Sequence, residues 1–538
     1  MLKPILNSFK KYQQYIFSCL FIISTPFLTW LFSSSLRLKY LIVGMALSLL
    51  ITLTVIWLNY KDKFRNWKWS RSDWVIMIFS LLVAKIYVGY FATNQELFFK
   101  FFGPGLTSYN LRLLRYSVAF LALPALFIYS KLITDRILVY TQEFLSRLNN
   151  KERYFLVATL LVGLVVSAVV HNLTSVWRNP GGDSCLYDVI YTSDSSCFDG
   201  DAVFTKFSMA ENDFRQPLFA VFSLPFSVLA KVLARIIFFL PHGYDVFMTA
   251  FQLGLLAIIL VMLSHLALLK TKDQIPFLVF GMGTFAFVSF WFLKEQYVFA
   301  TFYLIVAIYF NVQTKISADL LYVPAVGSLL TSAGLYPFTG KFVSLTDFLK
   351  RSIKSVAVFF SYAIITGQYY YLVHLLSGAK RLGSSFGGVE LDFLIKLKQY
   401  TYFVRSIFLA PASQVVNLPT GVKAYHLISV EKFSLVGIVI LGLVILSLWL
   451  HRRQQMAWIC GIWVLISAIL LVKLGWGAKE NGMTLYILYF SFGFLVPIFW
   501  LIRRIKFAWL RWGMIVTMIA FNLVGLLKIM KFGIIYYQ

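Results

Sequence analysis

The chain has 538 residues, of which 59% are hydrophobic and only 13% are charged, about half the charged share of a soluble domain. So little polar surface excludes soluble globular domains and disordered chains. The net charge of +27 fits Lys and Arg gathered in cytoplasmic loops rather than a nucleic-acid partner. The composition predicts an all-α polytopic integral membrane protein, since the apolar stretches are too long for membrane barrel strands.

Apolar stretches long enough to cross a bilayer recur along the chain, and we expect about 12–15 transmembrane helices. The candidate spans are 15–34, 40–59, 74–92, 116–134, 155–175, 217–240, 247–269, 275–293, 297–313, 319–337, 353–377, 432–450, 456–474, 483–502 and 512–535. The orientation rule does not fix whether the chain crosses the membrane an odd or an even number of times between residues 240 and 340. One of those segments is therefore expected to be re-entrant or interfacial. We divide the chain into N-terminal transmembrane helices, 1–154, and a catalytic region, 155–538.

Basic residues near the span ends set the expected orientation. Three connecting segments are rich in Lys and Arg and are predicted to be cytoplasmic: 60–72, 131–153 and 503–511. Alternation then places the N-terminus inside and the segments 176–216, 378–430 and 475–482 outside. The expected location is the cytoplasmic membrane of a bacterium, because the high content of Lys, Ile, Phe and Tyr indicates an AT-rich genome.

The segment 176–216 is acidic, unlike the rest of the chain. It holds 7 of the 22 acidic residues: Asp183, Asp188, Asp194, Asp199, Asp201, Glu211 and Asp213. A solvated outer loop would tolerate these acids, but they also favour a site built from carboxylates. The same segment contains Cys185 and Cys197, and thiols oxidise outside the cytoplasm, so we expect a disulfide between them.

Charged and aromatic residues interrupt the apolar runs at two further places. Lys294-Glu295-Gln296-Tyr297 separates two spans, where Lys suits a phosphate and Glu suits sugar hydroxyls. Gly475-Trp476-Gly477-Ala478-Lys479-Glu480-Asn481-Gly482 offers Trp476 for stacking on a sugar and Lys479, Glu480 and Asn481 for polar contacts. A charged hairpin and an interfacial turn are the simpler interpretations of these two patches.

The layout resembles that of the GT-C glycosyltransferases, integral membrane enzymes that use polyprenyl-phosphate sugars. In that superfamily a functional acid lies in an early outer loop, and a Pro-Leu-aromatic segment opens the next membrane helix. Here Asp201 and Asp199 precede Pro217-Leu218-Phe219. The resemblance covers roughly 155–500 and implies Asp201, with Asp199 as the alternative, as the catalytic base. The chain departs from the family in having about four spans before the acidic loop, where many members have none.

The leading hypothesis is therefore an inverting transfer of a sugar from a polyprenyl-phosphate donor to a cell-surface glycan or lipid acceptor on the outer face. Arg215 and Lys479 join Lys294 as candidate phosphate ligands, and Asp213 as a further substrate contact. The transfer requires no cofactor and no metal, although the acids are able to bind a divalent ion. A protein partner is not indicated.

Two alternatives stay open. One is a polymerase or ligase of lipid-linked glycans, in which Arg381 and Arg405 of the basic segment 378–430 would contact pyrophosphate. The other is a flippase or transporter of a lipid-linked substrate.

Ionisable residues inside the spans are functional candidates as well. They are Lys85, His171, Lys231, Arg235, His265, His374 and Lys473.

Overall fold

The chain forms two compact units, Met1–Leu148 with Phe360–Tyr370, and Asn149–Phe359 with Tyr371–Gln538. The computed structural model describes residues 70, 72–78, 80–81, 130–131, 134–178, 189–191, 216, 218–314, 319–339, 346, 349, 352–353, 356, 390–418, 421–428, 432–478 and 483–538. In the first unit, the described residues 72–78 and 134–147 are helical. There Lys131 donates to the buried carboxylate of Asp73 over 2.5 Å.

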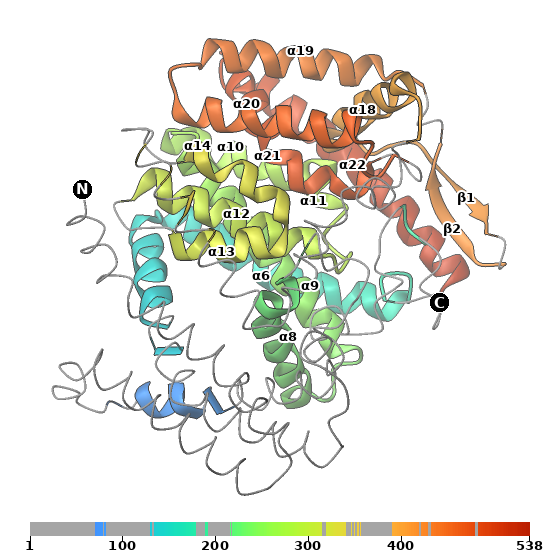
Figure 1. Ribbon diagram of the computed structural model, residues 1–538. Coiled ribbons are helices and arrows are strands. Elements are labelled where there is room, and N and C mark those ends of the chain that lie inside the picture. Colours follow the sequence, from blue (N-terminus) through green and yellow to red (C-terminus); the bar gives the residue numbers. More distant parts are fainter. Residues whose placement is uncertain are drawn as a thin grey trace, which may run out of the picture. The chain divides into compact units, whose positions relative to one another are not determined.

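The second unit is predominantly helical (Figure 1). Its described elements are α6 (Asn150–Leu173), α8 (Phe219–Ile236), α9 (Gly243–Leu266), α10 (Thr271–Gly283), α11 (Phe285–Val288), α12 (Gln296–Gln313), α13 (Asp319–Ser328), η2 (Leu330–Gly334), α14 (Tyr336–Thr339), α18 (Phe393–Phe408), β1 (Ser413–Asn417), β2 (Lys423–Leu427), α19 (Leu435–Leu450), α20 (Gln455–Ala468), η3 (Ile469–Lys473), η4 (Thr484–Tyr486), α21 (Ile487–Ile502) and α22 (Ala508–Tyr536).

Six helical stretches in the described part of the chain are long and apolar enough to cross a membrane. They are Asn150–Leu173, Gly243–Leu266, Gln296–Gln313, Gln455–Lys473, Thr484–Ile502 and Ala508–Tyr536. The predominance of helix is confirmed, and the six apolar helices are compatible with the predicted multi-pass membrane protein. α9 and α21 are mostly buried among other helices, whereas α6 and α22 leave most of their apolar side chains uncovered. α6 and α22, together with α19, therefore expose broad apolar surfaces, as expected of helices that face lipid.

Contacts between α6, α9 and α12 define two ends of the second unit. α6 and α9 are antiparallel, because Glu152 lies beside His265 while His171 lies beside Thr249. α12 runs parallel to α9, since Gln313 donates to the carbonyl of His265. We refer to these as the Glu152 end and the Asp245 end of the unit.

After α9, the chain returns from the Glu152 end to the Asp245 end through residues 271–295, which form an interrupted helix. The segment predicted as a span over 275–293 is not one continuous helix: α10 stops at Gly283, α11 has only four residues, and residues 292–295 are not helical. Gly283 lets α22 approach closely, since a Cβ there would lie 2.2 Å from the side chain of Ile519. Thr284 then takes an extended conformation that ends α10.

A second predicted span, 319–337, is also wrong as a single helix. α13 has ten residues with Pro324 inside it, and Gly327 packs against Leu218 at the start of α8. The chain then turns through η2, and Thr339 receives hydrogen bonds from Asn311 and Gln455, both at the Glu152 end. This segment therefore leaves and returns to the same end, as expected of a re-entrant segment.

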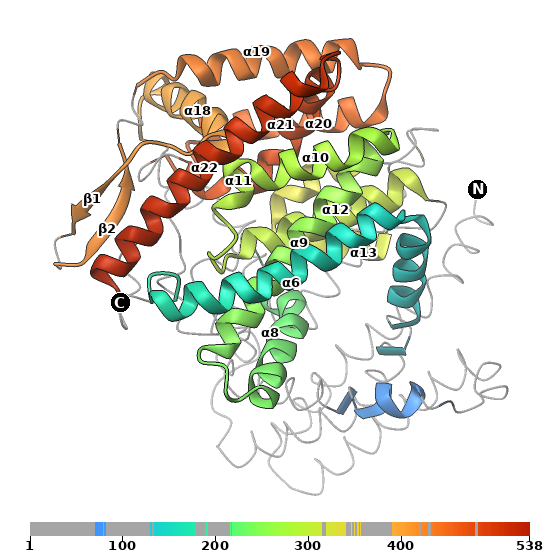
Figure 2. The same ribbon diagram turned by 180° about the vertical axis from the view of Figure 1, so that it is seen from behind.

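α19, α20, α21 and α22 run in alternating directions between the two ends (Figures 1 and 2). α19 ends beside Trp500 near the end of α21, where the ring of His451 stacks at 4.6 Å. α22 starts near α10, since Arg511 pairs with Asp273, and finishes at the Asp245 end, where the amide of Ser175 donates to Tyr537. The long last helix thus passes from one end of the unit to the other (Figure 2).

The segment predicted as outer loop 378–430 contains regular structure that the sequence reading missed. α18 occupies 393–408, and the antiparallel hairpin of β1 and β2 pairs Ser413 with Leu427. Gly421 has a positive φ of 80° in the hairpin turn, a conformation that glycine adopts without strain. The hairpin lies beside the last part of α22, where the rings of Tyr425 and Phe532 are 5.4 Å apart (Figure 1).

Candidate functional site

A buried ion pair joins Lys294 and Asp245 at the Asp245 end of the unit. The ammonium of Lys294 donates to the carboxylate of Asp245, and the two side chains are 2% and 14% exposed. Lys294 also lies over the ring of Tyr244, 5.9 Å from its centre. A charge pair with so little exposure is costly to desolvate, so it marks a functional candidate rather than a simple source of stability.

Arg178 and His242 form the second pair of this end. The guanidinium of Arg178 donates to Nδ1 of His242, so the ring accepts through that nitrogen and is neutral. Burial lowers the pKa of Arg178, and the charge of Asp245 acts in the opposite direction. Burial also lowers the pKa of His242, and Arg178 lowers it further. We call Lys294, Asp245, Arg178, His242 and the buried His171 the Asp245 cluster.

Several buried donors of this region have no hydrogen-bond acceptor among the described residues. They are Nε1 of Trp177, Nε of Arg178 and, when it carries the ring proton, Nδ1 of His171. Trp177 is fully buried. Buried polar atoms without partners are rare in folded proteins and call for an explanation such as a ligand. Among the described residues of the cluster, Lys294 and Arg178 accompany one carboxylate, so the cluster offers basic side chains and donors to an anion.

Local backbone structure brings these residues together. Pro241 and the left-handed His242 turn the chain into α9, so that Asp245 lies in the first helical turn, where the helix dipole favours a carboxylate. Lys294 belongs to the extended residues before α12. Nε2 of Gln252, on α9, donates to the carbonyls of Leu293 at 3.3 Å and Glu295 at 3.2 Å, which fixes this extended segment against α9.

The structure places two of the predicted substrate-binding patches near each other. Glu295 is buried next to Lys294, and Tyr297 follows it in the first turn of α12. The ring of Tyr486 contacts Tyr297 at 5.4 Å and Trp476 at 4.6 Å. The rings of Tyr297, Tyr486 and Trp476 therefore connect the two patches. The substrate-binding roles of Lys294, Glu295 and Trp476 stay predictions.

The two predicted outer loops also meet at one point. Residues 189–191 belong to the acidic segment, and Tyr191 donates its amide to the carbonyl of Tyr425 in β2 over 2.8 Å. The amide of Tyr425 donates to Val189 in return, over 2.7 Å. The acidic segment 176–216 is thereby attached to the hairpin of the basic segment 378–430.

The other predicted site residues lie outside the described residues. They are Asp199, Asp201, Asp213, Arg215, Lys479, Glu480, Asn481, Cys185 and Cys197. The acidic segment nevertheless leaves the described structure at Arg178, within the Asp245 cluster, and re-enters near Leu218, whose amide donates to Gly327. The expected base and the expected disulfide stay predictions.

Sequence reasoning missed Asp245, Arg178 and His242. A helix-start signal was present, because Pro241-His242-Gly243 precedes an acid and a long apolar run. The predicted span nevertheless began at residue 247, which placed Asp245 in a connecting loop. No local pattern links residues 178, 245 and 294, since they are brought together only by the packing of α6, α9 and α12.

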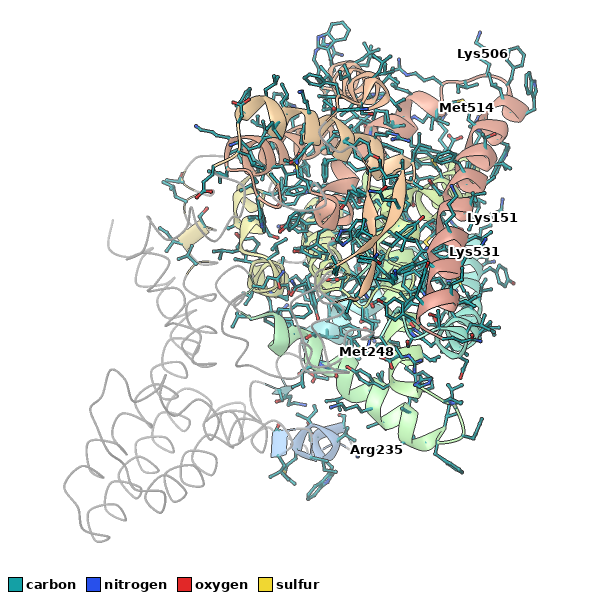
Figure 3. The ribbon with its side chains drawn as sticks, turned by 90° about the vertical axis from the view of Figure 1, so that its right-hand side faces the viewer. Lys151, Arg235, Met248, Lys506, Met514 and Lys531 are labelled. Atoms are coloured by element: carbon teal, nitrogen blue, oxygen red, sulfur yellow. The ribbon has the colours of Figure 1, made fainter. Side chains whose placement is uncertain are left out.

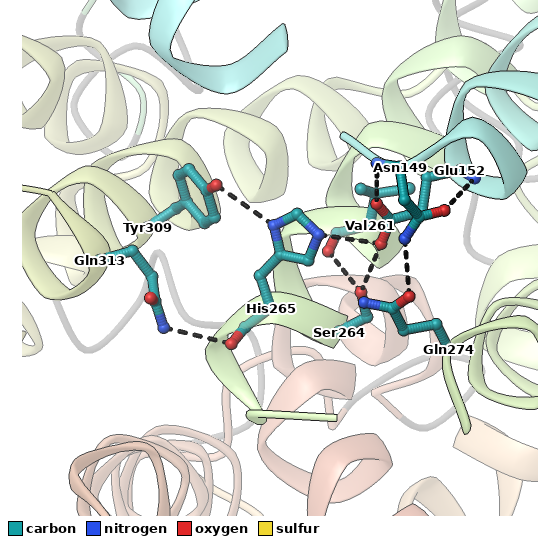
Figure 4. Close-up of polar contacts among 8 residues, drawn as sticks. All are labelled: Asn149, Glu152, Val261, Ser264, His265, Gln274, Tyr309 and Gln313. Atoms are coloured by element: carbon teal, nitrogen blue, oxygen red, sulfur yellow. Dashed lines mark hydrogen bonds and ion pairs between the residues drawn. The ribbon is translucent and has the colours of Figure 1, made fainter. Parts of the chain in front are cut away.

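A contrasting polar cluster lies at the Glu152 end (Figure 4). Glu152 is completely buried, and its Oε1 lies 2.8 Å from Nε2 of His265 and 3.5 Å from the hydroxyl of Ser264. The hydroxyl of Tyr309 lies 3.2 Å from Nδ1 of the same His265.

The Glu152 cluster also closes the start of α6. Asn149 and Glu152 form a capping box, in which each side chain accepts from the other residue's backbone amide. The side chain of Asn149 also donates to Gln274 over 2.8 Å (Figure 4). Every interaction of this cluster has a structural purpose, namely to cap α6 and to hold it against α9 and α10.

Within the ranges that the structure describes, no group of three or more His, Cys, Asp or Glu side chains is arranged to hold a metal ion. Cys460 is a buried thiol.

No protein-family model matches the chain, and neither a curated protein nor a solved structure matches it.

Proposed function

We propose that the protein is a membrane glycosyltransferase that moves a sugar from a polyprenyl-phosphate donor to a glycan or lipid acceptor. The observation that carries the proposal is the ion pair between Lys294 and Asp245, at a helix end where Arg178 also feels the charge of that carboxylate. Among the described residues of the Asp245 cluster, two basic side chains accompany one carboxylate where several apolar helices end. A lipid phosphate presents a negative headgroup at that depth, and fixed cations stabilise it best where water is scarce.

In the proposed reaction the acceptor hydroxyl attacks the anomeric carbon. The new bond joins that carbon to the acceptor oxygen, and the bond to the phosphate oxygen breaks. Asp201, or alternatively Asp199, takes the hydroxyl proton. The polyprenyl phosphate leaves with the bonding electrons, and Arg178 and Lys294 stabilise the charge that develops on it. Displacement from the opposite face inverts the anomeric configuration.

The remaining predicted residues bind substrate in this scheme. Arg215 and Lys479 supply further positive charge for the phosphate. Asp213, Glu295, Trp476, Glu480 and Asn481 contact the sugar or the acceptor. Attachment of the acidic segment to the hairpin through Tyr191 and Tyr425 supports a site assembled from both outer segments.

The membrane orientation is part of the proposal. The connections of the second unit that carry many Lys and Arg residues, such as 503–511, lie at the Glu152 end. The positive-inside rule then puts that end in the cytoplasm and the Asp245 cluster on the outer face of the cytoplasmic membrane. This location suits a donor that arrives already activated on a lipid. The GT-C-like arrangement and a total of 12–15 spans belong to the same proposal.

The test measures the glycan composition of source cells in which the gene is deleted. The deletion strain is compared with strains complemented, at matched expression, by the wild type, by Asp201→Asn or by Lys294→Gln. We expect the deletion and Asp201→Asn to lose the same sugar, and Lys294→Gln to restore about one hundredth of it. If Asp201→Asn restores the full glycan, Asp201 is not the base. If the deletion changes no glycan, the glycosyltransferase proposal fails.

A transporter of a lipid-linked substrate is the second candidate, and the broken crossing between α10 and α12 favours it. Discontinuous helices that lie near buried charges are common at the substrate sites of transporters. A transporter predicts that purified protein in vesicles moves a fluorescent polyprenyl-phosphate analogue between leaflets. The glycosyltransferase predicts sugar release from the donor without such movement.

A further inference from the structure

Three connections at the Glu152 end carry a dense set of cations. The segments are 267–274, 451–455 and 503–511, and together they hold eight basic side chains and one acid. The residues are Lys270, Lys272, Arg452, Arg453, Arg503, Arg504, Lys506, Arg511 and the acid Asp273. This charge lies at the opposite end of the unit from the Asp245 cluster.

The three connections touch one another and form one surface. Nε1 of Trp500, at the end of α21, donates to the carbonyl of Ala267 over 3.2 Å. The ring of His451 stacks on Trp500, and Arg511 donates to Asp273 over 3.0 Å. The cations are therefore held together by packed contacts rather than by chance proximity in sequence.

The single acid does not neutralise the centre of this surface. Asp273 is paired with Arg511. The side chain of Arg504 instead approaches Nε2 of His451 at 3.5 Å. Nδ1 of His451 lies 2.8 Å from the carbonyl of Ser447, which it reaches as a donor, so Nε2 is the acceptor and the ring is neutral.

The charges at this centre also oppose one another. Burial lowers the pKa of His451, and the positive charges of Arg504 and Arg503 lower it further. Burial lowers the pKa of Arg503 as well; Asp273 opposes this effect and Arg504 adds to it. Two adjacent arginines, one of them partly buried, thus share one acid that already has a partner. An added anion would relieve this excess of charge.

Exposed aromatic rings surround the cations, as expected at the level of lipid headgroups. The guanidinium of Arg452 lies 4.9 Å from the centre of the Trp449 ring, and Nε1 of Trp458 donates to the carbonyl of Arg452. Trp449, Trp458, Phe507 and Trp509 are all more than half exposed. Such rings favour a membrane surface over a soluble anion as the partner.

We propose that Arg503 and Arg504, with Arg452 and Arg453 beside them, bind the phosphate of an anionic phospholipid. The planar guanidinium matches a phosphate with two parallel hydrogen bonds, which a lysine cannot offer. This site is independent of the proposed glycosyl transfer and lies at the other end of the unit.

Native mass spectrometry of the full chain, titrated with phosphatidylglycerol in detergent, tests the proposal. We expect Arg503→Gln/Arg504→Gln to weaken the binding about 30-fold, since each cation near an anionic surface contributes about a factor of five. Arg503→Lys/Arg504→Lys keeps the charge and should lose only a part of that affinity. Phosphatidylcholine should bind equally weakly to all of these proteins.

The matched control is Lys528→Gln/Lys531→Gln, which removes two exposed cations from the far part of α22. Figure 3 shows Lys531 well away from Lys506, which precedes α22. Equal loss of phosphatidylglycerol in the control, or unchanged binding in Arg503→Gln/Arg504→Gln, would overturn the proposal. Thermal stabilisation by inorganic phosphate as large as that by phosphatidylglycerol would also overturn it, because the site would then be one for soluble anions.

Discussion

The two polar clusters of the second unit differ in how their charges are compensated. In the Glu152 cluster one carboxylate meets a histidine, a serine and a helix cap, and its side chains all have partners. In the Asp245 cluster the one described carboxylate pairs with Lys294 and lies within the electrostatic influence of Arg178, and buried donors of Arg178 and Trp177 have no acceptor among the described residues. Both clusters lie at helix ends and contain buried side chains, such as Glu152 and Lys294, so the burial of single residues does not separate them.

The difference indicates that hydrogen-bond completeness distinguishes a structural cluster from a functional one. A closed network stabilises the fold and leaves nothing to offer a ligand. A network with surplus donors and surplus positive charge costs stability unless a ligand uses it. We therefore propose that the Glu152 cluster serves stability and that the Asp245 cluster serves binding, and each proposal has its own test.

The largest expected effect is on activity in Lys294→Gln. We expect the transferred glycan per folded molecule to fall about 100-fold, because a fixed cation facing the leaving phosphate is lost. Thermal unfolding in detergent is measured as well, because removing one partner of a buried ion pair also costs stability, and the activity is therefore expressed per folded molecule. The matched control is Lys231→Gln, which removes a lysine that lies over the same Tyr244 ring at 6.0 Å. Full activity in Lys294→Gln would contradict the binding role that we propose for the Asp245 cluster.

Glu152→Ala should have the largest effect on stability. It removes the cap of α6 and the partner of the buried His265, and we expect the free energy of unfolding to fall by about 3 kcal/mol. Glu143→Ala is the control, because Glu143 forms an exposed pair with Arg147 and should cost less than about 0.5 kcal/mol. Activity per folded molecule should be unchanged in both. A specific activity loss in Glu152→Ala would place that cluster in the reaction.

Tyr309→Phe should have a smaller effect on the same network. The substitution removes only the hydroxyl beside Nδ1 of His265, and we expect a loss of about 1 kcal/mol in unfolding free energy. Tyr154→Phe, at an exposed position of α6, serves as the control and should leave the unfolding temperature unchanged. Equal unfolding temperatures for Tyr309→Phe and the wild type would show that the network does not depend on this contact.

The smallest effect concerns pH and His242. Its pKa is lowered in the folded protein by burial and by Arg178, so the unfolded chain binds more protons just below pH 6.5. Stability should therefore be complete above that pH and decline as the pH falls through the window beneath it, by about 0.5 kcal/mol for a partly exposed group. His242→Gln should remove this decline. A wild-type stability that rises on acidification over that window, and does so equally in His242→Gln, contradicts the assignment.

The sequence by itself determined the class of the protein and the positions of several of the described helices. The predicted spans 155–175, 247–269, 297–313 and 483–502 match helices closely, because a bilayer requires long apolar runs and a helix satisfies its own backbone hydrogen bonds. The sequence predicted the breaks within helices less well than the positions of helices. The spans over 275–293 and 319–337 looked continuous because their apolar composition is uniform, although their backbones are interrupted.

Only the tertiary structure decided which polar residues meet. Lys294 was identifiable as a charge between two apolar runs, but its partner Asp245 is 49 residues away, and Arg178 reaches His242 across 64 residues. Hydrophobic periodicity reports which face of a helix is apolar, but it carries no information on which helix ends come together. That choice is made by the packing of α6, α9 and α12, where the cost of burying a charge depends on neighbours supplied by distant parts of the chain.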